Sequence, residues 1–211
     1  MKLTKFAHAC VTLEKDGAKI VLDPGTLTPD AKDAVAGAAA VLVTHEHFDH
    51  FDDALLAAAL DADHDLRVFG PRAVLEKLGD HEGRVRAVEA GDTIDVGGFR
   101  VSVHGDRHAT IHADIPCVDN VGYLVDEAVF HPGDAYFTPV APVDTLLLPT
   151  SGPWTVLGQA VDYVRAVKPR RVVQIHELML SELGQNATAT FVANLTGVEE
   201  TLLAPGQSIS L

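Results

Sequence analysis

Short apolar runs separated by polar turns make up most of this chain, and they predict many β-strands. Residues 3–13 alternate loosely between apolar and polar, and Asp16-Gly17 followed by the run 19–22 predicts a hairpin with an Asp-Gly turn. Residues 38–44 are a short continuous apolar run, as expected for a strand that is covered on both faces. Further strands are expected at residues 66–69, 85–88, 93–96, 99–103, 121–125, 128–130, 145–148, 172–175 and 208–211.

Helix signals lie between these runs. Asp52 and Asp53 precede the strong helix formers of residues 54–60, and acidic side chains in a first turn suit the helix dipole. Pro71 opens a second helix that Gly79 ends. Two more helices are expected at residues 156–167, stopping before Pro169, and near residues 189–195. Because strands and helices fill both halves without a linker, we expect a single domain, residues 1–211, folded as a layered α/β sandwich with two mixed sheets.

The composition allows a large core and argues against some partners. Of the 211 residues, 47% are hydrophobic, and 16 basic against 30 acidic side chains give a formal net charge of −14. This charge, without a basic run, argues against nucleic acid or an anionic membrane surface as a partner. Cys10 and Cys117 indicate neither a disulfide framework nor a thiolate zinc cage. No signal peptide or membrane span is evident, so we expect a cytoplasmic protein.

The string His45-Glu46-His47-Phe48-Asp49-His50 follows a predicted buried strand and is the strongest functional signal in the chain. Imidazole nitrogen and carboxylate oxygen are ligands that zinc accepts. In extended backbone, alternate side chains share a face, so His45, His47 and Asp49 project together, whereas His50 lies one step further round. The pattern therefore predicts a metal site in which one set of side chains holds a first metal and the other set a second.

Further ligands are expected at the ends of other predicted strands. His104, His108 and His112 follow one strand at spacings of four, but Gly105 makes a helix improbable there, so the three side chains do not all point together. Asp134 lies in the tight turn His131-Pro132-Gly133-Asp134. His176 lies at the end of the predicted strand of residues 171–175. These positions are the candidates to complete a centre with two metal ions.

These motifs, taken in order, resemble the metallo-β-lactamase fold hydrolases, and within them the small proteins similar to ascorbate-phosphate lactonase and N-acyl-phosphatidylethanolamine phospholipase. The resemblance covers nearly the whole chain and implies a four-layer αββα sandwich. The H-x-H-x-D-H string is highly specific to the family. The other matching segments are Phe6-Ala7-His8, Leu22-Asp23-Pro24-Gly25, Asn120-Val121-Gly122-Tyr123, Phe130-His131-Pro132-Gly133-Asp134 and Ile175-His176.

The resemblance implies a role for each matching residue. One metal ion would be bound by His45, His47 and a later histidine, for which His108 fits best and His112 is the alternative. The second ion would be bound by Asp49, His50 and His176, and Asp134 would bridge the two. His8 is either close to the metals or a hydrogen-bond partner that fixes the first hairpin, and both readings stay open.

The implied chemistry is hydrolysis by a hydroxide between two divalent ions, with zinc expected and manganese or iron as alternatives. Asp49 and His131 are the expected catalytic residues: Asp49 as ligand and orienter of the hydroxide, and His131 as one candidate, with His112 and Tyr136, for the group that protonates the leaving group. A small ester, lactone or phosphoester is the expected substrate. The competing hypothesis is a non-hydrolytic redox or sensing protein, although iron redox relatives usually carry a glutamate where this chain has His47.

Overall fold

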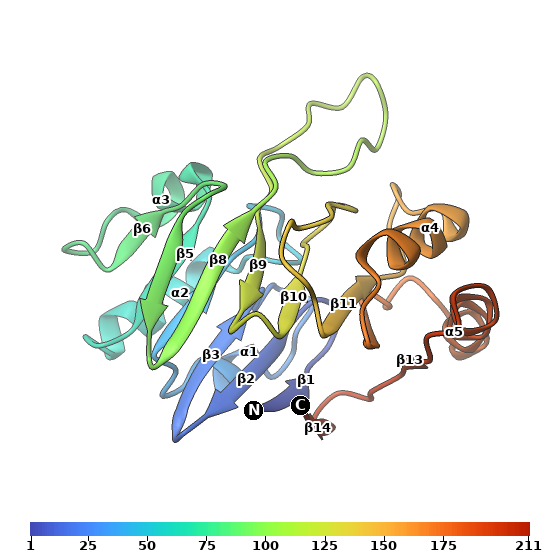
Figure 1. Cartoon of the computed structure of the whole chain (residues 1–211). Helices are drawn as coiled ribbons and strands as arrows, with labels where there is room; N and C mark the ends of the chain where they lie inside the picture. The colour runs from blue at the N-terminus through green and yellow to red at the C-terminus, as the bar shows by residue number, and fades with distance from the viewer.

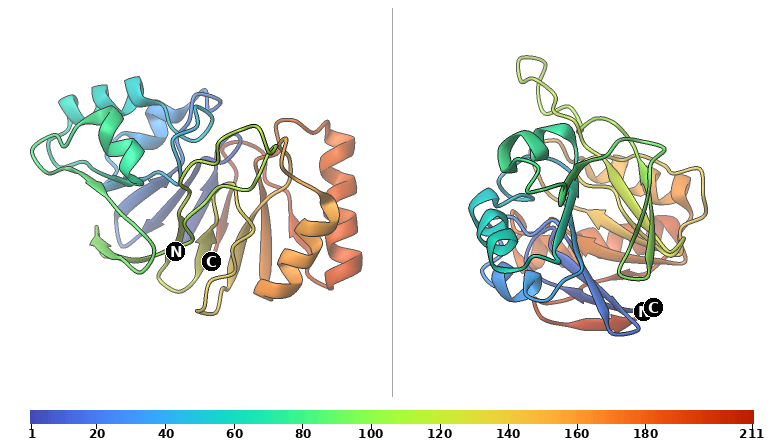
Figure 2. Two further views of the ribbon diagram at one scale, coloured as in Figure 1. Left: turned by 90° about the horizontal axis from the view of Figure 1, so that it is seen from above. Right: turned by 90° about the vertical axis from the view of Figure 1, so that its left-hand side faces the viewer.

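The computed structural model describes residues 1–211 and has four layers, with two mixed seven-stranded sheets facing each other and helices on both outer sides (Figure 1). Figure 2 shows α1–α3 on one side and α4–α5 on the other, with both sheets between them. This arrangement confirms the predicted αββα sandwich. No helix has the length and apolar character needed to cross a bilayer.

The first sheet begins with an antiparallel hairpin and continues with parallel strands. The Asp-Gly turn lies between β2 and β3 as predicted, with Asp16 at φ 52° and Gly17 at φ 82°. From β3 to β6 the neighbouring strands are parallel. The order is β14 (Ser208–Ser210), β1 (Lys2–Lys5), β2 (Val11–Lys15), β3 (Ala18–Leu22), β4 (Ala40–Leu42), β5 (Arg67–Gly70) and β6 (Val85–Ala87).

The second sheet follows the same arrangement along the chain, because its antiparallel strands come first and its parallel strands last. β7, β8, β9 and β10 pair antiparallel, whereas β10, β11, β12 and β13 pair parallel. The order is β13 (Glu200–Thr201), β12 (Arg171–Ile175), β11 (Thr145–Pro149), β10 (Val129–His131), β9 (Gly122–Val125), β8 (Phe99–His104) and β7 (Thr93–Val96).

Helices cover the outer face of each sheet with one apolar side. Leu56 and Leu60 of α2 pack with Val41 of the first sheet, and Val161 and Val164 of α4 pack in a cluster on the second. The helices are α1 (Ala31–Val35), α2 (Asp53–Ala62), α3 (Arg72–Leu78), α4 (Leu157–Val167) and α5 (Glu182–Thr196).

The structure corrects two of the expected elements and adds two that were not expected. Residues 3–13 form two strands, since the chain turns at residues 6–10, where His8 has φ 60°. α5 begins at Glu182 rather than near 189, because the Ser181 side chain caps its first turn by accepting a hydrogen bond from the Gly184 amide at 3.2 Å. α1 and β13 were not expected, since each is too short to produce a periodic pattern.

The inner faces of the two sheets share one core of 21 buried residues. Leu13 and Ile20 come from the first sheet and Leu147 and Val173 from the second, and burying each such side chain stabilises the fold by about 2 kcal/mol. Tyr123 also joins the sheets, because its hydroxyl donates to the Val43 carbonyl oxygen at 2.8 Å. The two sheets therefore pack around one common core.

The strands that lead into the predicted metal ligands end at one edge of the sandwich. β3 and β4 run parallel in the first sheet, and β10, β11 and β12 run parallel in the second. β8 points the same way as β10, because β9 is antiparallel to both. The loops after these strands therefore meet, and the loop after β8 projects furthest from the sandwich (Figure 1).

Gly25 allows two of these loops to touch. A Cβ atom at this position would lie 2.1 Å from the backbone carbonyl carbon and oxygen of Asp49, closer than any real contact. We expect Gly25→Ala to lower the free energy of unfolding by about 2 kcal/mol, because the loop of residues 43–52 must shift. Gly158→Ala in α4 is the matched control, since nothing lies within 4 Å of its Cβ position and alanine favours a helix. Urea unfolding of both variants measures the difference, and equal stabilities would contradict this close contact.

Glu200 makes stability depend on pH. It is 5% exposed, and burial raises the pKa of its carboxyl from 4.5 to about 8. Between these two pKa values the folded state holds a proton that the unfolded state has released. The contribution of Glu200 to the free energy of unfolding is therefore intact below pH 4.5 and is lost as the pH rises to about 8. Glu200→Gln, a neutral side chain of the same shape, should gain on the order of 3 kcal/mol relative to the native protein between pH 5 and 8. Urea unfolding at each pH tests this, and parallel pH profiles for the two proteins would refute it.

Candidate metal centre

Histidine and aspartate side chains from several loops meet at the edge where the parallel strands end. The string that follows β4 supplies the largest group, and each of the other loops supplies one residue. The side chains are His45, His47, Asp49 and His50 after β4, His108 after β8, Asp134 after β10, His176 after β12, and His8 from the turn between β1 and β2.

Asp23 at the end of β3 fixes the start of the string. Its carboxylate has no solvent exposure, and it accepts hydrogen bonds from the Thr44 amide and hydroxyl, both at 2.7 Å. It also accepts from Nδ1 of His50 at 2.6 Å. Because Nδ1 is held in this way, Nε2 of His50 points into the centre, 3.1 Å from Oδ1 of Asp134.

One group of possible ligands consists of His45, His47 and His108, whose ligand atoms all lie within 4.8 Å of one another. Nε2 of His45 lies 3.1 Å from Nδ1 of His47. Nδ1 of His108 donates to the Ala109 carbonyl oxygen at 2.6 Å, which leaves its Nε2 with a lone pair directed at the centre. Three nitrogen donors thus face one point.

A second group contains His8, Asp49, His50 and His176, also within 4.8 Å of one another. Nε2 of His8 donates to Oδ2 of Asp49 at 3.0 Å, and Nε2 of His176 lies 3.4 Å from the same oxygen. The rings of His8 and His176 have centroids only 3.8 Å apart. This group combines nitrogen and oxygen donors.

Asp134 lies between the two groups. Its Oδ2 is 3.4 Å from Nε2 of His108 in the first group and 3.1 Å from Nε2 of His176 in the second. Trp154 donates its indole N–H to the same oxygen at 2.9 Å, which limits rotation of the carboxylate. Asp134 is thus the one carboxylate within reach of both groups.

Burial keeps part of the cluster neutral. It holds the pKa of His45 well below its ordinary value of 6.5, and it also lowers the pKa of His47 and of His8. These three rings are therefore uncharged at neutral pH. A neutral imidazole has the free lone pair that a metal ion requires.

His50, Asp49 and Asp134 carry opposite charges within the cluster. Burial opposes a charge on His50, but the carboxylates of Asp134 and Asp23 outweigh it and raise the pKa of His50 well above 6.5. Burial likewise acts to raise the pKa of Asp134, yet His50 and His176 hold it well below its ordinary value. The pKa of Asp49 is also lowered, because the contacts of its carboxylate with the His176 and His8 rings outweigh burial. A bound cation would take over the charge now carried by imidazolium protons.

The donor set fits a metal ion. Nε2 of His50, Nε2 of His176 and Oδ1 of Asp134 are buried polar atoms that lie at ion-pair distances within the cluster but make no hydrogen bond of good geometry. Leaving such atoms unpaired costs about 1–3 kcal/mol each, so a buried cluster of them indicates a missing partner. Nitrogen-rich ligands with carboxylates match the preferences of zinc and of other divalent ions of its kind.

The structure brings His108, and not His112, to the cluster. His108 is 5% exposed and its ring centroid lies 4.8 Å from that of His47. The side chain of His112 is 65% exposed and lies beside Asp114 on the projecting loop. The two histidines are four positions apart in an irregular loop, so no sequence period could decide between them.

His131 and Tyr136 are engaged by the backbone. Nε2 of His131 donates to the Ala9 carbonyl oxygen at 3.0 Å, and its Nδ1 accepts from the Gly133 amide at 3.1 Å. The hydroxyl of Tyr136 donates to the Pro149 carbonyl oxygen at 3.1 Å. Neither ring nitrogen of His131 is free to transfer a proton, so its contacts favour positioning of the β10 turn over the catalytic role expected from the sequence.

A buried ion pair that sequence reasoning missed supports the second group. Nζ of Lys5 lies 2.9 Å from Oε1 of Glu177, and the same oxygen accepts from the His8 amide at 3.3 Å. The His176 amide in turn donates to the His8 carbonyl oxygen at 3.0 Å. His8 and His176 both have positive φ angles, 60° and 56°, which residues other than glycine rarely adopt. No local signal could reveal this pair, since its partners are 172 positions apart.

Comparison with known proteins identifies the family. Residues 2–176 match the family described as the beta-lactamase superfamily domain. Protein Rv0786c of Mycobacterium tuberculosis is 36% identical over 186 residues, which cover 86% of each chain. A UPF0173 metal-dependent hydrolase of Metallosphaera sedula is 26% identical and covers 98% of this chain and 97% of its own.

A solved structure shows the same fold. Igni18, a metallo hydrolase from the archaeon Ignicoccus hospitalis, superimposes with a TM-score of 0.78 at 20% identity, covering 99% of this chain and 97% of its own. Sequence and fold thus agree with the site chemistry. The chain belongs to the beta-lactamase superfamily and is a metal-dependent hydrolase of the metallo-β-lactamase fold.

Proposed function

We propose that the protein holds two divalent metal ions, most readily zinc, and uses them to hydrolyse a small ester, lactone or phosphoester. The observation that carries the proposal is the pair of donor groups, one of three histidines and one containing Asp49, His50 and His176, with Asp134 within reach of both. A single ion would leave one group of buried donors unpaired. Two ions would satisfy both.

In this proposal the first ion is held by His45, His47 and His108, and the second by Asp49, His50 and His176, with Asp134 shared. Two such ions, when bound, lower the pKa of water and polarise a carbonyl or phosphoryl oxygen. The protein contributes the arrangement. His8 and Trp154 each donate a hydrogen bond to a ligand carboxylate, Asp49 and Asp134 respectively, so both carboxylates are held in one orientation.

The burial of the side chains around the site determines where water can reach it. His45 and His50 have no solvent exposure, so the inner side of the site excludes bulk water. Asp49 is the carboxylate with the greater access, at 14% side-chain exposure, and it accepts the N–H of His8. We assign Asp49 the orientation of the attacking water and His131 a positioning role.

The central experiment loads purified protein with zinc, manganese or iron and measures bound metal and hydrolysis across esters, lactones and phosphodiesters. About two zinc or manganese ions per chain with turnover of at least one class supports the proposal. Iron with an oxygen-dependent spectrum and no hydrolysis would replace it with the redox alternative.

Removal of the metal should also lower stability. At a free metal concentration about 100 times Kd, binding adds about 2.7 kcal/mol to the free energy of unfolding. Chelation should therefore lower the melting temperature by roughly 5–10 °C for a chain of this length. Thermal unfolding before and after chelation, with zinc restored as a control, measures this. A melting temperature that does not change when zinc is added would mean that the donors are not a metal site.

The two loop histidines provide a matched test of the ligand set. His108→Ala should lower metal affinity and kcat/KM by at least about 100-fold, because it removes a ligand whose orienting partners alone are worth 10–100-fold. His112→Ala, four residues away and exposed, should leave both within about twofold. Metal titration and steady-state kinetics give the comparison. A larger loss in the His112 variant would reverse the assignment.

A further inference from the structure

The loops that surround the metal centre carry almost no positive charge. These rim loops are residues 23–30, 43–52, 105–121, 132–144, 150–156 and 176–181, which follow β3, β4, β8, β10, β11 and β12. Arg107 is their only lysine or arginine. Its guanidinium already contacts the Cys117 carbonyl oxygen at 3.4 Å within its own loop. A site built for an anion would normally present several arginine or lysine side chains.

The nearest lysines outside the rim loops are engaged as well. Lys5 is completely buried and bound to Glu177. Nζ of Lys77, on α3, lies 3.0 Å from the carboxylate of Glu46 inside the metal-binding string. With a formal net charge of −14 for the chain, the surroundings of the centre repel rather than attract anions.

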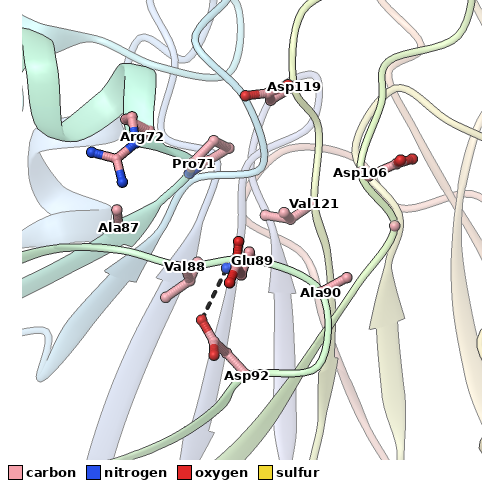
Figure 3. A pocket seen from close by; sticks show the side chains of 11 residues that line it. Pro71, Arg72, Ala87, Val88, Glu89, Ala90, Asp92, Asp106, Asp119 and Val121 are labelled. Carbon is pink, nitrogen blue, oxygen red and sulfur yellow. Dashed lines mark hydrogen bonds between the residues drawn. The ribbon is translucent and has the colours of Figure 1, made fainter.

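A pocket beside the projecting loop is also poor in positive charge. Its volume is about 410 Å³, and Arg72 is the only basic residue in its lining (Figure 3). Four carboxylates, those of Glu89, Asp92, Asp106 and Asp119, surround it. None of the cluster histidines lines this pocket, so it is separate from the centre and offers no binding site for a phosphate attached to a substrate.

Large apolar side chains are exposed on the same rim loops. Phe48, between two residues of the cluster, is 63% exposed, and Met179, three residues after His176, is 65% exposed. The Phe48 carbonyl oxygen accepts from the Thr26 amide at 2.8 Å, and the next residue, Leu27, is 36% exposed. Exposed apolar side chains gathered around a reactive centre mark a binding surface.

The projecting loop contributes its apolar side to the centre. Ile115 is 49% exposed, yet it lines a narrow cavity together with His47 and His108. Pro116 and Val118 line the same cavity. Apolar surface thus approaches the first donor group from the loop after β8, and the exposed Met179 follows His176 of the second group by three residues.

We propose that the substrate is an uncharged carboxylic ester or lactone with an apolar chain, and not a phosphoester, and that Phe48, Ile115 and Met179 bind the chain. This inference rests on the proposed hydrolase function. In the reaction, the oxygen of water bonds to the acyl carbon and the bond from that carbon to the ester oxygen breaks. One proton of the water passes to the departing oxygen, so the products are a carboxylic acid and an alcohol. A lactone gives both groups in one molecule.

The first test compares chain lengths with metal-loaded protein. p-Nitrophenyl acetate, butyrate and octanoate differ only in their methylene groups, each worth about fourfold in affinity when buried. We expect kcat/KM to rise at least about tenfold from acetate to octanoate, and bis(p-nitrophenyl) phosphate to react at least about tenfold more slowly than octanoate. Faster hydrolysis of the phosphodiester would overturn the inference and leave the proposed hydrolase function standing.

Matched phenylalanine variants test the surface itself. Phe48→Ser should lower kcat/KM for octanoate by roughly fivefold or more and for acetate by less than about twofold, with metal content unchanged. Met179→Ser, outside the metal-binding string, should act in the same direction. Phe191→Ser, on α5 and 50% exposed, should change neither substrate. Equal losses for both chain lengths in Phe48→Ser and Met179→Ser would contradict binding of the chain by these residues.

Binding of unreactive analogues separates this inference from the proposed function. 2-Octanone is an uncharged ketone that cannot be hydrolysed, and dibutyl phosphate is its anionic counterpart. Calorimetry with metal-loaded protein should show 2-octanone binding at least about tenfold more tightly, and Phe48→Ser should remove that advantage. If no ester is turned over but this preference holds, the hydrolase proposal fails and the binding surface stands. Tighter binding of dibutyl phosphate would overturn the surface assignment.

Discussion

The buried carboxylate of Asp23 is the contact on which the metal centre depends. It lies at the end of β3, has no solvent exposure, and holds the backbone of Thr44 and the ring of His50 at the end of the neighbouring strand β4. An isolated buried carboxylate would be costly, but these hydrogen bonds compensate for the lost water. They also orient the metal-binding string, and Gly25 lets the two loops approach at backbone distance. Without this contact the string would be a mobile loop of histidines.

A second buried contact, between Lys5 and Glu177, joins the first strand of one sheet to the end of β12 in the other. Buried ion pairs contribute little net stability, and their value lies in the geometry they impose. Here the geometry is that of His8 and His176, two residues with left-handed backbone whose ring centroids lie 3.8 Å apart, with the ring planes tilted by 48°. The two sheets therefore bring complementary parts of one site together, the string from the first sheet and single ligands from the second.

The centre and its surroundings have opposite character. Inside, histidines and carboxylates pair so closely that charge persists despite burial, as the raised pKa of His50 and the lowered pKa of Asp134 show. Outside, the rim loops carry exposed apolar side chains such as Phe48 and only one cation, Arg107. The ends of the strands position the donor side chains of the candidate centre. The loops determine what can approach it, because they vary without disturbing the strands.

The sequence by itself determined the sandwich of two mixed sheets, the Asp-Gly hairpin and the metal-binding string, because strand periodicity and ligand spacing are local properties. It also singled out Asp134 and His176 as strand-end candidates. Only the tertiary structure placed His108 in the cluster and His112 outside it, placed His8 against Asp49, and engaged both ring nitrogens of His131 with the backbone. These outcomes depend on partners far apart in the chain, and side-chain direction in an irregular loop follows no period. The physical reason is that a metal centre is assembled where the sheets meet, and no single segment contains that meeting point.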